Sequence, residues 1–408
     1  MTIQLHKSVI KEQSNITITG SKSESNRLLL LQALYPELKI NNVSNSDDSI
    51  VMQKALTSKE TTLDIHHAGT AMRFLTAYFA SKEGRNVALT GSSRMKERPI
   101  EILVDALHQL GAEISYTEAY GCPPIRIQGK KLTKHKVTLK ANVSSQYISA
   151  LLLIASRLEN GLELTLEGKI TSIPYINMTL DLLNQVGIQT TFENQVIKVN
   201  SKKDALKTES LTVESDWSSA SYFYSIVALS PIGTEVKLTS YKEESLQGDS
   251  VLAHIYIAFG VKTVFGGDSI LLKKVEDSKS NTVEFQLNNS PDIAQTIAVT
   301  CLGLGLKCHL TGLHTLKIKE TDRLVALQNE LQKLGATIDI TEDTLTLHKT
   351  VTLNKNVAIA TYNDHRMAMA FAPLALKTDV IIEDYRVVSK SYPTFWDDLK
   401  TLGFKFSK

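Results

Sequence analysis

The sequence predicts an α/β protein made of six similar units, each of which combines helices and strands. Three observations support this fold class: polar clusters open apolar helices at a regular spacing, glycines end helices at a similar spacing, and alternating apolar segments follow those glycines. The chain has 408 residues, a length typical of two or three domains, so six units divide naturally into two domains of three.

The polar clusters lie near residues 21, 69, 144, 218, 290 and 364, and the last four intervals are 75, 74, 72 and 74 residues. Each cluster runs into an apolar stretch, for example residues 28–31 and 151–154. Ser, Asp and Asn favour a helix start because their side chains accept hydrogen bonds from free backbone N–H groups. A helix start also carries partial positive charge, so six such starts predict a binding site for a highly anionic ligand.

Glycines mark the opposite ends of predicted helices. They stand at positions 111, 187, 260, 335 and 403, at intervals of 76, 73, 75 and 68 residues. A glycine just past a helix tolerates the left-handed conformation that ends it. The alternating segments 112–116 and 336–340 that follow two of these glycines predict strands. Each unit therefore contains two helices and several strands, and a shorter first unit around Leu56 completes the six.

Charge and cysteine content narrow the class of protein. A net charge of only +2 does not indicate a nucleic acid or an anionic membrane as partner, and no apolar run approaches the roughly 20 residues of a membrane span. The amino terminus lacks the apolar core of a signal peptide. Three cysteines without CxxC spacing argue against a disulfide framework, so we expect a cytoplasmic protein.

Three charged segments are candidates for chemistry: 94–100, 317–323 and 362–366. Lys319 and Arg323 are four residues apart, which would place them on one helix face, and an ordinary solvated face with ion pairs remains an alternative there. Asp292 and Glu320 are acids among cations, an arrangement that suits proton transfer. The sequence has no phosphate-binding GxxxxGK[ST] loop, no HExxH and no Cys/His cluster, so no metal or cofactor is expected.

Seven motifs together resemble the signatures of the 5-enolpyruvylshikimate-3-phosphate (EPSP) synthase family. They occur in the family's order over nearly the whole chain, at residues 20–27, 68–73, 94–99, 144–146, 291–292, 319–323 and 364–367. The resemblance implies two similar domains of three βαβαββ repeats each, the inside-out α/β barrel of enolpyruvyl transferases, with the active site in the interdomain cleft. The expected domains are residues 20–214 and residues 1–19 plus 215–408, with crossovers near 19–20 and 214–215.

The resemblance also implies an activity. Members of this family transfer the enolpyruvyl group of phosphoenolpyruvate to the 5-hydroxyl of shikimate 3-phosphate and release phosphate, by addition and elimination through a tetrahedral intermediate. This step belongs to the shikimate pathway to chorismate and the aromatic amino acids. The expected protein is a cytoplasmic monomer without a cofactor, and its retained Gly69 resembles the glyphosate-sensitive members.

Site residues carry over from the motifs position by position. Those expected at shikimate 3-phosphate are Lys22, Ser23, Arg27, Ser144, Ser145, Gln146, Ser172, Asp292 and Lys319. Those expected at phosphoenolpyruvate are Lys22, Gly69, Arg94, Gln146, Arg323, Arg366 and Lys390. For catalysis we expect Asp292 on the hydroxyl side, and Glu320 with Lys22 and Lys390 at the methylene carbon and the leaving phosphate.

The chain departs from the family pattern at a few positions. His67 and Thr315 replace asparagines, and Glu24 stands where an apolar residue is common. The cluster at Ser218 has no expected ligand, and we expect it to support the crossover instead.

Two other functions are alternatives. The sister transferase acts on a UDP-linked amino sugar and often carries a reactive Cys in a loop that here, at residues 92–98, has none. A pure polyanion-binding module would gain nothing from Asp292 and Glu320 inside its cationic site.

Overall fold

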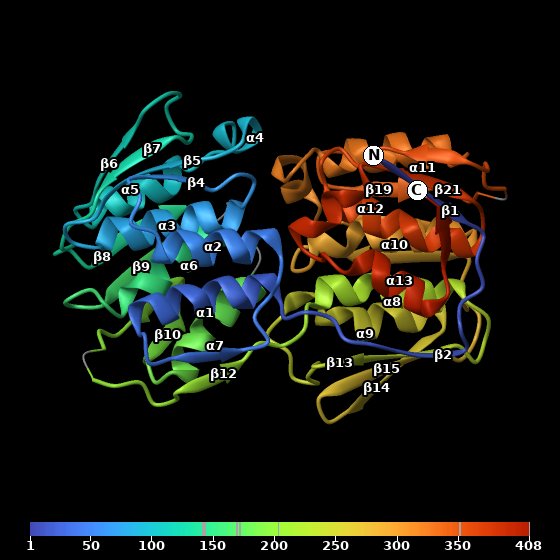
Figure 1. The fold of residues 1–408 in the computed structure, drawn as a ribbon, viewed down its shortest axis with the longest axis horizontal. Helices are drawn as coiled ribbons and strands as arrows, with labels where there is room; N and C mark the ends of the chain where they lie inside the picture. The colour runs from blue at the N-terminus through green and yellow to red at the C-terminus, as the bar shows by residue number, and fades with distance from the viewer. Residues whose placement is uncertain (141–143, 169, 171–172, 203, 351, 408) are drawn as a thin grey trace. The chain divides into compact units, whose positions relative to one another are not determined.

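The protein, described here from a computed structural model, divides into two compact units (Figure 1). The structure describes residues 1–140, 144–168, 170, 173–202, 204–350 and 352–407. Unit 1 consists of Met1–Thr19 and Glu214–Lys408, and unit 2 consists of Gly20–Val213. The chain therefore starts in unit 1, leaves it for unit 2 and then returns.

One sheet pattern recurs in both units. Each four-stranded sheet contains a parallel pair of strands, followed by two strands added antiparallel. Unit 2 has two four-stranded sheets. The first has the strand order β4 (Thr62–Asp64), β5 (Asn86–Thr90), β7 (Ile125–Gln128), β6 (Glu113–Tyr116). The second has the order β10 (Thr190–Glu193), β11 (Val196–Val199), β9 (Leu162–Glu167), β8 (Lys136–Lys140). None of the sheets that the described residues form closes into a barrel.

Helices alternate with these strands along the chain. In unit 2, β4 leads to α3 (Gly69–Ser81), β5 to α4 (Ser93–Lys96) and α5 (Glu101–Gln109), β8 to α6 (Ser145–Ala155), and β9 to α7 (Ile173–Gln185). The order is βαβαββ in both cases. The third repeat of unit 2 is shorter. It consists of α1 (Lys22–Leu34), β3 (Lys39–Asn41) and α2 (Asp47–Thr57), and β3 pairs in parallel with β12 (Ser210–Thr212).

Unit 1 contains three such sheets. The first has the strand order β14 (Val261–Gly266), β15 (Ser269–Lys274), β13 (Glu235–Thr239), β2 (Gln13–Ile16). The second has the order β16 (Thr282–Gln286), β17 (Lys307–Thr311), β19 (Leu345–Leu347), β18 (Ile338–Ile340). The third has the order β20 (Val357–Ile359), β21 (Val380–Glu383), β1 (Thr2–His6), β22 (Lys405–Ser407). The amino-terminal segment supplies β1 and β2, and so completes two repeats whose other strands come from the second half of the chain.

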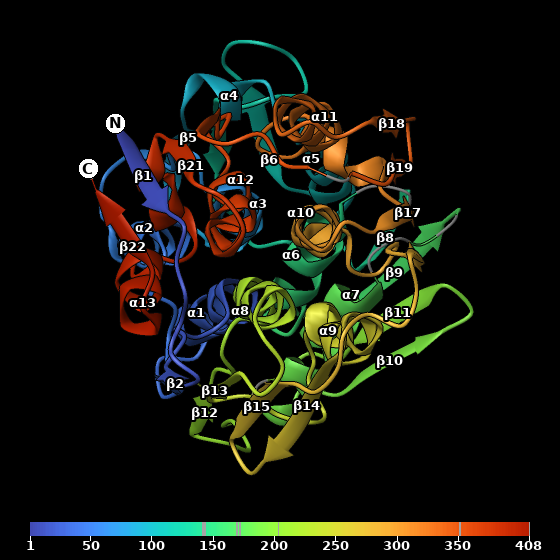
Figure 2. The ribbon, with the colours of Figure 1, turned by 90° about the vertical axis from the view of Figure 1, so that its right-hand side faces the viewer.

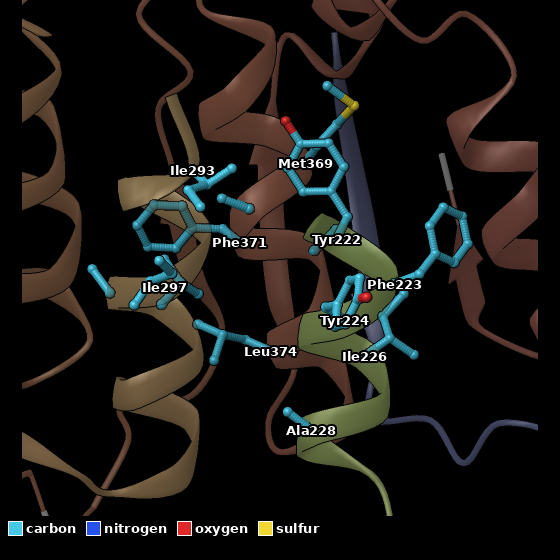
Figure 3. Close-up of a cluster of buried hydrophobic side chains, with 14 of the residues drawn as sticks. Tyr222, Phe223, Tyr224, Ile226, Ala228, Ile293, Ile297, Met369, Phe371 and Leu374 are labelled. Carbon is cyan, nitrogen blue, oxygen red and sulfur yellow. The ribbon is translucent and has the colours of Figure 1, made fainter. Parts of the chain in front are cut away.

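Three helices form the centre of unit 1. These are α8 (Trp217–Leu229), α10 (Ala294–Leu304) and α12 (His365–Phe371), which contact one another and are seen nearly end-on in Figure 2. Their residues are buried on almost every side, and Figure 3 shows Tyr222, Ile297 and Phe371 within this core. A helix that is apolar all round must lie inside the protein, which explains why the sheets lie outside these helices.

The other helices of unit 1 lie among the strands. They are α9 (Leu252–Ile255), α11 (Arg323–Lys333) and α13 (Phe395–Leu402), with short 3₁₀ helices η1 (Gly248–Val251), η2 (Tyr256–Phe259), η3 (Pro291–Ile293), η4 (His314–Ile318), η5 (Ala372–Leu376) and η6 (Tyr385–Lys390). Within the described part of the chain, no helix has the length and apolar character needed to cross a membrane.

The predicted helix ends are confirmed. All five glycines have positive φ, between 72° and 111°. The strands predicted at 112–116 and 336–340 are present as β6 and β18.

The predicted helix starts are confirmed with two adjustments. Ser21, Ser144 and Asp364 cap their helices through side-chain oxygens, but Asp216 rather than Ser218 caps α8. Ser290 precedes the 3₁₀ turn η3, which leads into α10.

Gly260 provides a test of this helix-end geometry. A Cβ built there would lie 1.8 Å from the carbonyl oxygen of Glu276, whereas at Gly267, which also has positive φ, it would meet nothing within 4 Å. We expect Gly267→Ala to lower the free energy of unfolding by about 1–2 kcal/mol through backbone strain alone. Gly260→Ala should cost about 3 kcal/mol or more, because the backbone must also move. Urea unfolding of both variants measures this difference, and equal losses would contradict it.

Candidate active site

Arg323 is the most deeply buried charge among the predicted site residues of unit 1. It is the first residue of α11 and only 1% exposed, and its guanidinium contacts three carboxylates. Nε lies 2.6 Å from Asp364, one Nη lies 2.8 Å from Asp292, and the other lies 2.7 Å from Glu320. Burial alone would lower its pKa, but the three acids outweigh burial and raise it above the ordinary value.

Lys319 does not share a helix face with Arg323, so that prediction is wrong. Asp322 caps α11 by accepting hydrogen bonds from the backbone N–H groups of Leu324 and Val325, at 3.1 and 3.2 Å. This cap starts the helix at Arg323 and leaves Lys319 in the turn after η4. The two cations still meet, because Lys319 Nζ lies 3.5 Å from the Asp292 oxygen that Arg323 also contacts.

Asp292 is the acid that these cations share. It lies in η3, at the entry to α10. Burial favours its neutral form, but Lys319, Arg366 and Arg323 hold the pKa of this carboxyl well below its usual range. Asp292 is therefore ionised at neutral pH in the ligand-free protein.

Arg366 lies in the first turn of α12, where Asp364 caps the helix by accepting from its backbone N–H at 2.9 Å. Its side chain donates to the backbone carbonyl of Asp292 at 3.1 Å and lies 3.4 Å from that residue's carboxylate. A third donation, at 3.2 Å, goes to the hydroxyl of Ser218 at the start of α8. The starts of α8, α10 and α12 therefore meet around one guanidinium.

A strained turn precedes this helix start. Tyr362 and Asn363 both have positive φ, 53° and 56°, which costs side-chain-bearing residues about 1–2 kcal/mol each. The Tyr362 hydroxyl donates to the buried Glu330 at 2.6 Å, and Lys390 Nζ donates to the Asn363 carbonyl at 2.6 Å. These contacts hold the turn that brings Asp364 to the start of α12. Lys390 ends η6 and so belongs to this support.

Asp249 was not singled out from the sequence. It lies in η1, is only 2% exposed, and accepts a hydrogen bond from the Ser218 hydroxyl through Oδ2. Burial raises its pKa to about 6, against the attraction of Arg366. The sequence around it lacks a helical or strand period, so no local signal marked this acid. Asp364, by contrast, lies in the helix start predicted near residue 364, where an acid is a favoured N-cap.

In unit 2, Arg27 is held firmly by the protein. It is 2% exposed and donates to the Thr179 hydroxyl at 2.8 Å, the Ser149 hydroxyl at 3.0 Å and the Tyr175 carbonyl at 3.2 Å. A further donation to the Ser23 carbonyl, at 2.7 Å, ties it to the first turn of α1. Burial lowers its pKa to about 10. Most of its donors are therefore already used.

The starts of α1, α3 and α6 carry most of the other predicted residues of unit 2. Ser21 caps α1 just before Lys22, and Ser144 caps α6 just before Ser145. Gln146 Nε2 donates to the Thr70 hydroxyl at 3.2 Å and so joins α6 to α3. Ser172 lies outside the described residues.

Gly69 and Arg94 lie in different surroundings. A Cβ on Gly69 would lie 2.5 Å from an Nη of Arg98, a residue that the sequence analysis did not single out. Arg94, in α4, is about half exposed and pairs with Glu97 at 3.0 Å. His67, just before α3, lies 3.8 Å from Asp47.

The repeated βαβαββ units are the fold predicted for an enolpyruvyl transferase. The whole chain superposes on two solved structures of EPSP synthase from Acinetobacter baumannii, with TM-scores of 0.80 and 0.79, full coverage of both chains and 20% and 19% identity. This likeness confirms the predicted fold class.

The family itself follows from sequence. Residues 51–399 match the family of EPSP synthase (3-phosphoshikimate 1-carboxyvinyltransferase), and the chain belongs to this family. It is 46% identical over 401 residues to a 3-phosphoshikimate 1-carboxyvinyltransferase of Bacteroides fragilis, with 96% of each chain covered. A protein of the same name from Actinobacillus pleuropneumoniae is 37% identical over 427 residues, with 97% and 98% covered.

The pH dependence of stability tests the surroundings of Asp249. Its ordinary pKa of 3.8 is raised to about 6, so between these values the folded protein binds the proton more tightly than the unfolded chain. The folded state therefore loses stability as pH rises through this window. Asp249→Asn mimics the neutral acid and should raise the free energy of unfolding by about 1–3 kcal/mol at pH 8, and by roughly half as much at pH 5. Urea unfolding at both pH values checks this, and a gain independent of pH would contradict it.

Proposed function

We propose that this chain transfers the enolpyruvyl group of phosphoenolpyruvate to the 5-hydroxyl of shikimate 3-phosphate and releases phosphate. The observation that carries the proposal is the ionised Asp292 between Lys319, Arg323 and Arg366 in a member of this family. The cations suit the phosphates and carboxylates of two anionic substrates, and the acid suits proton transfer.

The proposed binding residues are those that the family motifs imply. For shikimate 3-phosphate we assign Lys22, Ser23, Arg27, Ser144, Ser145, Gln146, Ser172, Asp292 and Lys319. For phosphoenolpyruvate we assign Lys22, Gly69, Arg94, Gln146, Arg323, Arg366 and Lys390. Within these sets Arg27, Arg323 and Lys390 also carry the protein's own hydrogen bonds, so they would act from fixed positions.

The proposed reaction has two steps with opposite proton transfers. In the addition, the 5-hydroxyl attacks the carbon that bears the phosphate, while its proton leaves and another proton reaches the methylene carbon. In the elimination, a proton leaves the new methyl group, the C–O bond to phosphate breaks, and the double bond re-forms. We assign Asp292 to the hydroxyl, and Glu320 with Lys22 and Lys390 to the methylene carbon and the leaving phosphate.

The surroundings of Asp292 set a condition on this role. A carboxylate whose pKa is held so low is a weak base, and general bases work best when their pKa is near the operating pH. Substrate anions that approach Lys319 and Arg366 offset the charges that hold this pKa down. Binding of the substrates therefore makes Asp292 a better proton acceptor.

We also propose that the protein works as a cytoplasmic monomer without a cofactor. The three cysteines are free thiols, as in a reducing compartment.

One experiment separates this function from its two rivals. The protein is incubated with shikimate 3-phosphate and phosphoenolpyruvate, and phosphate release is measured. A parallel reaction contains a UDP-linked amino sugar in place of shikimate 3-phosphate. We expect release only with shikimate 3-phosphate; release only with the UDP-sugar would indicate the sister transferase, and binding without release would indicate a binding module.

Substitution of the two acids tests their proposed roles. Asp292→Asn and Glu320→Gln keep the shape of each side chain but remove proton transfer, so each should lower kcat about 10²–10⁴-fold. Glu342→Gln is the control, because Glu342 pairs with Lys317 at the surface and is 88% exposed. Turnover of either acid variant near that of the unmodified protein would reject its assignment.

Inhibition by glyphosate tests the proposed place of Gly69. We expect glyphosate to inhibit the protein tightly, and Gly69→Ala to raise the required concentration at least about tenfold, because the added methyl group would displace the Arg98 guanidinium. Inhibition curves at fixed phosphoenolpyruvate measure this effect. Resistance of the unmodified protein to millimolar glyphosate would contradict the prediction.

A further inference from the structure

The start of α8 has the same polar character as the other helix starts, yet the proposed function gives it no substrate. Ser218, in its first turn, is hydrogen-bonded on two sides. Its hydroxyl accepts from Nη2 of Arg366 at 3.2 Å and donates to Oδ2 of Asp249. Ser218 therefore lies between a cation assigned to phosphoenolpyruvate and a buried acid with no assigned role.

Asp249 lowers the stability of the folded protein in this position. Its side chain is almost wholly buried, and its second oxygen, Oδ1, has no hydrogen-bond partner among the described residues. The charged groups that act on it are Arg366, which attracts it, and Asp292 and Asp216, which repel it. A buried carboxylate with one unsatisfied oxygen lowers stability, so its presence calls for a function.

The geometry indicates how Asp249 acts. A serine hydroxyl has one proton, and Asp249 accepts it, so only lone pairs of Ser218 face Arg366. Without that acceptor, the Ser218 side chain is free to change rotamer and donate its proton to another acceptor. Arg366 would then lose the acceptor that holds Nη2 on the side of α8.

Arg366 is thus held from two directions. Asp292 binds it from η3 through its backbone carbonyl and its carboxylate, and Ser218 binds it from α8. Two fixed contacts orient a planar guanidinium, so its remaining N–H groups point in a set direction toward an anion.

We propose that Ser218 and Asp249 are a positioning pair that orients Arg366 for phosphoenolpyruvate. The pair rests on the proposed function, because it presumes that Arg366 binds this substrate. Asp249 does not touch the substrate, and it acts only through Ser218.

The test compares the Michaelis constants for the two substrates. Ser218→Ala removes the link, and we expect it to raise KM for phosphoenolpyruvate about tenfold and to change KM for shikimate 3-phosphate less than twofold. Ser225→Ala is the control on the same helix: Ser225 lies seven residues further along α8, is fully buried whereas Ser218 is half-buried, and accepts a hydrogen bond from Thr300 at 2.8 Å. It should leave both constants within twofold.

A double-mutant cycle tests whether Asp249 acts through Ser218. Asp249→Ala should match the effect of Ser218→Ala, whereas Asp249→Asn retains an acceptor and should change KM for phosphoenolpyruvate less than about threefold. In the Ser218→Ala background, either Asp249 change should add less than twofold. If Asp249→Ala does not fold, the KM values of Ser218→Ala and Asp249→Asn for phosphoenolpyruvate still test the proposal.

Three results would overturn the pair: an unchanged KM for phosphoenolpyruvate in Ser218→Ala, equal rises for both substrates, or effects that multiply in the double variant. Failure of the proposed function looks different, because the unmodified protein would then release no phosphate from the two substrates.

Discussion

The burial of Arg323 is the constraint on which the geometry of unit 1 depends. A guanidinium that is almost completely removed from water requires nearby negative charge, since an unpaired buried charge costs several kcal/mol. The three carboxylates that supply it come from η3, from the turn before α11 and from the cap of α12. One side chain therefore fixes the relative positions of three chain segments that are far apart in sequence.

The repeat explains why these segments lie close together. The helices α8, α10 and α12 are buried on almost every side, so their charged residues lie only at their starts, where free backbone N–H groups also need partners. Because the same strand–helix order recurs, the helix starts lie at one end of the unit, where Ser218, Asp292 and Arg366 are in contact. A feature that first indicated only anion binding is thus a consequence of central, fully buried helices.

Much of this could be predicted from the sequence, because the signals are local. A glycine after a helix, such as Gly260, and a serine before one, such as Ser144, each report the conformation of their own neighbours. The contact of Ser218 with Arg366 joins residues 148 positions apart, and no spacing along the chain encodes it. Lys319 was misplaced for a related reason: charge spacing suggested a helix, but the cap formed by Asp322 determines where the helix begins.

The ligand-free cluster in unit 1 already balances its charges, and this bears on how substrates bind. Lys319, Arg323 and Arg366 are engaged by Asp292 and its neighbours, so an incoming phosphate or carboxylate competes with Asp292 for the cations rather than meeting free ones. On the assignments proposed above, each such exchange loosens the hold on Asp292 and moves its pKa toward the range useful to a base. Arg323 stays paired with Asp364 in this exchange, because their contact is the more deeply buried, whereas Lys319 is the more exposed cation. On these proposed assignments, charge neutralisation would couple substrate binding to proton transfer, which gives the acid Asp292 a function inside a site for anions.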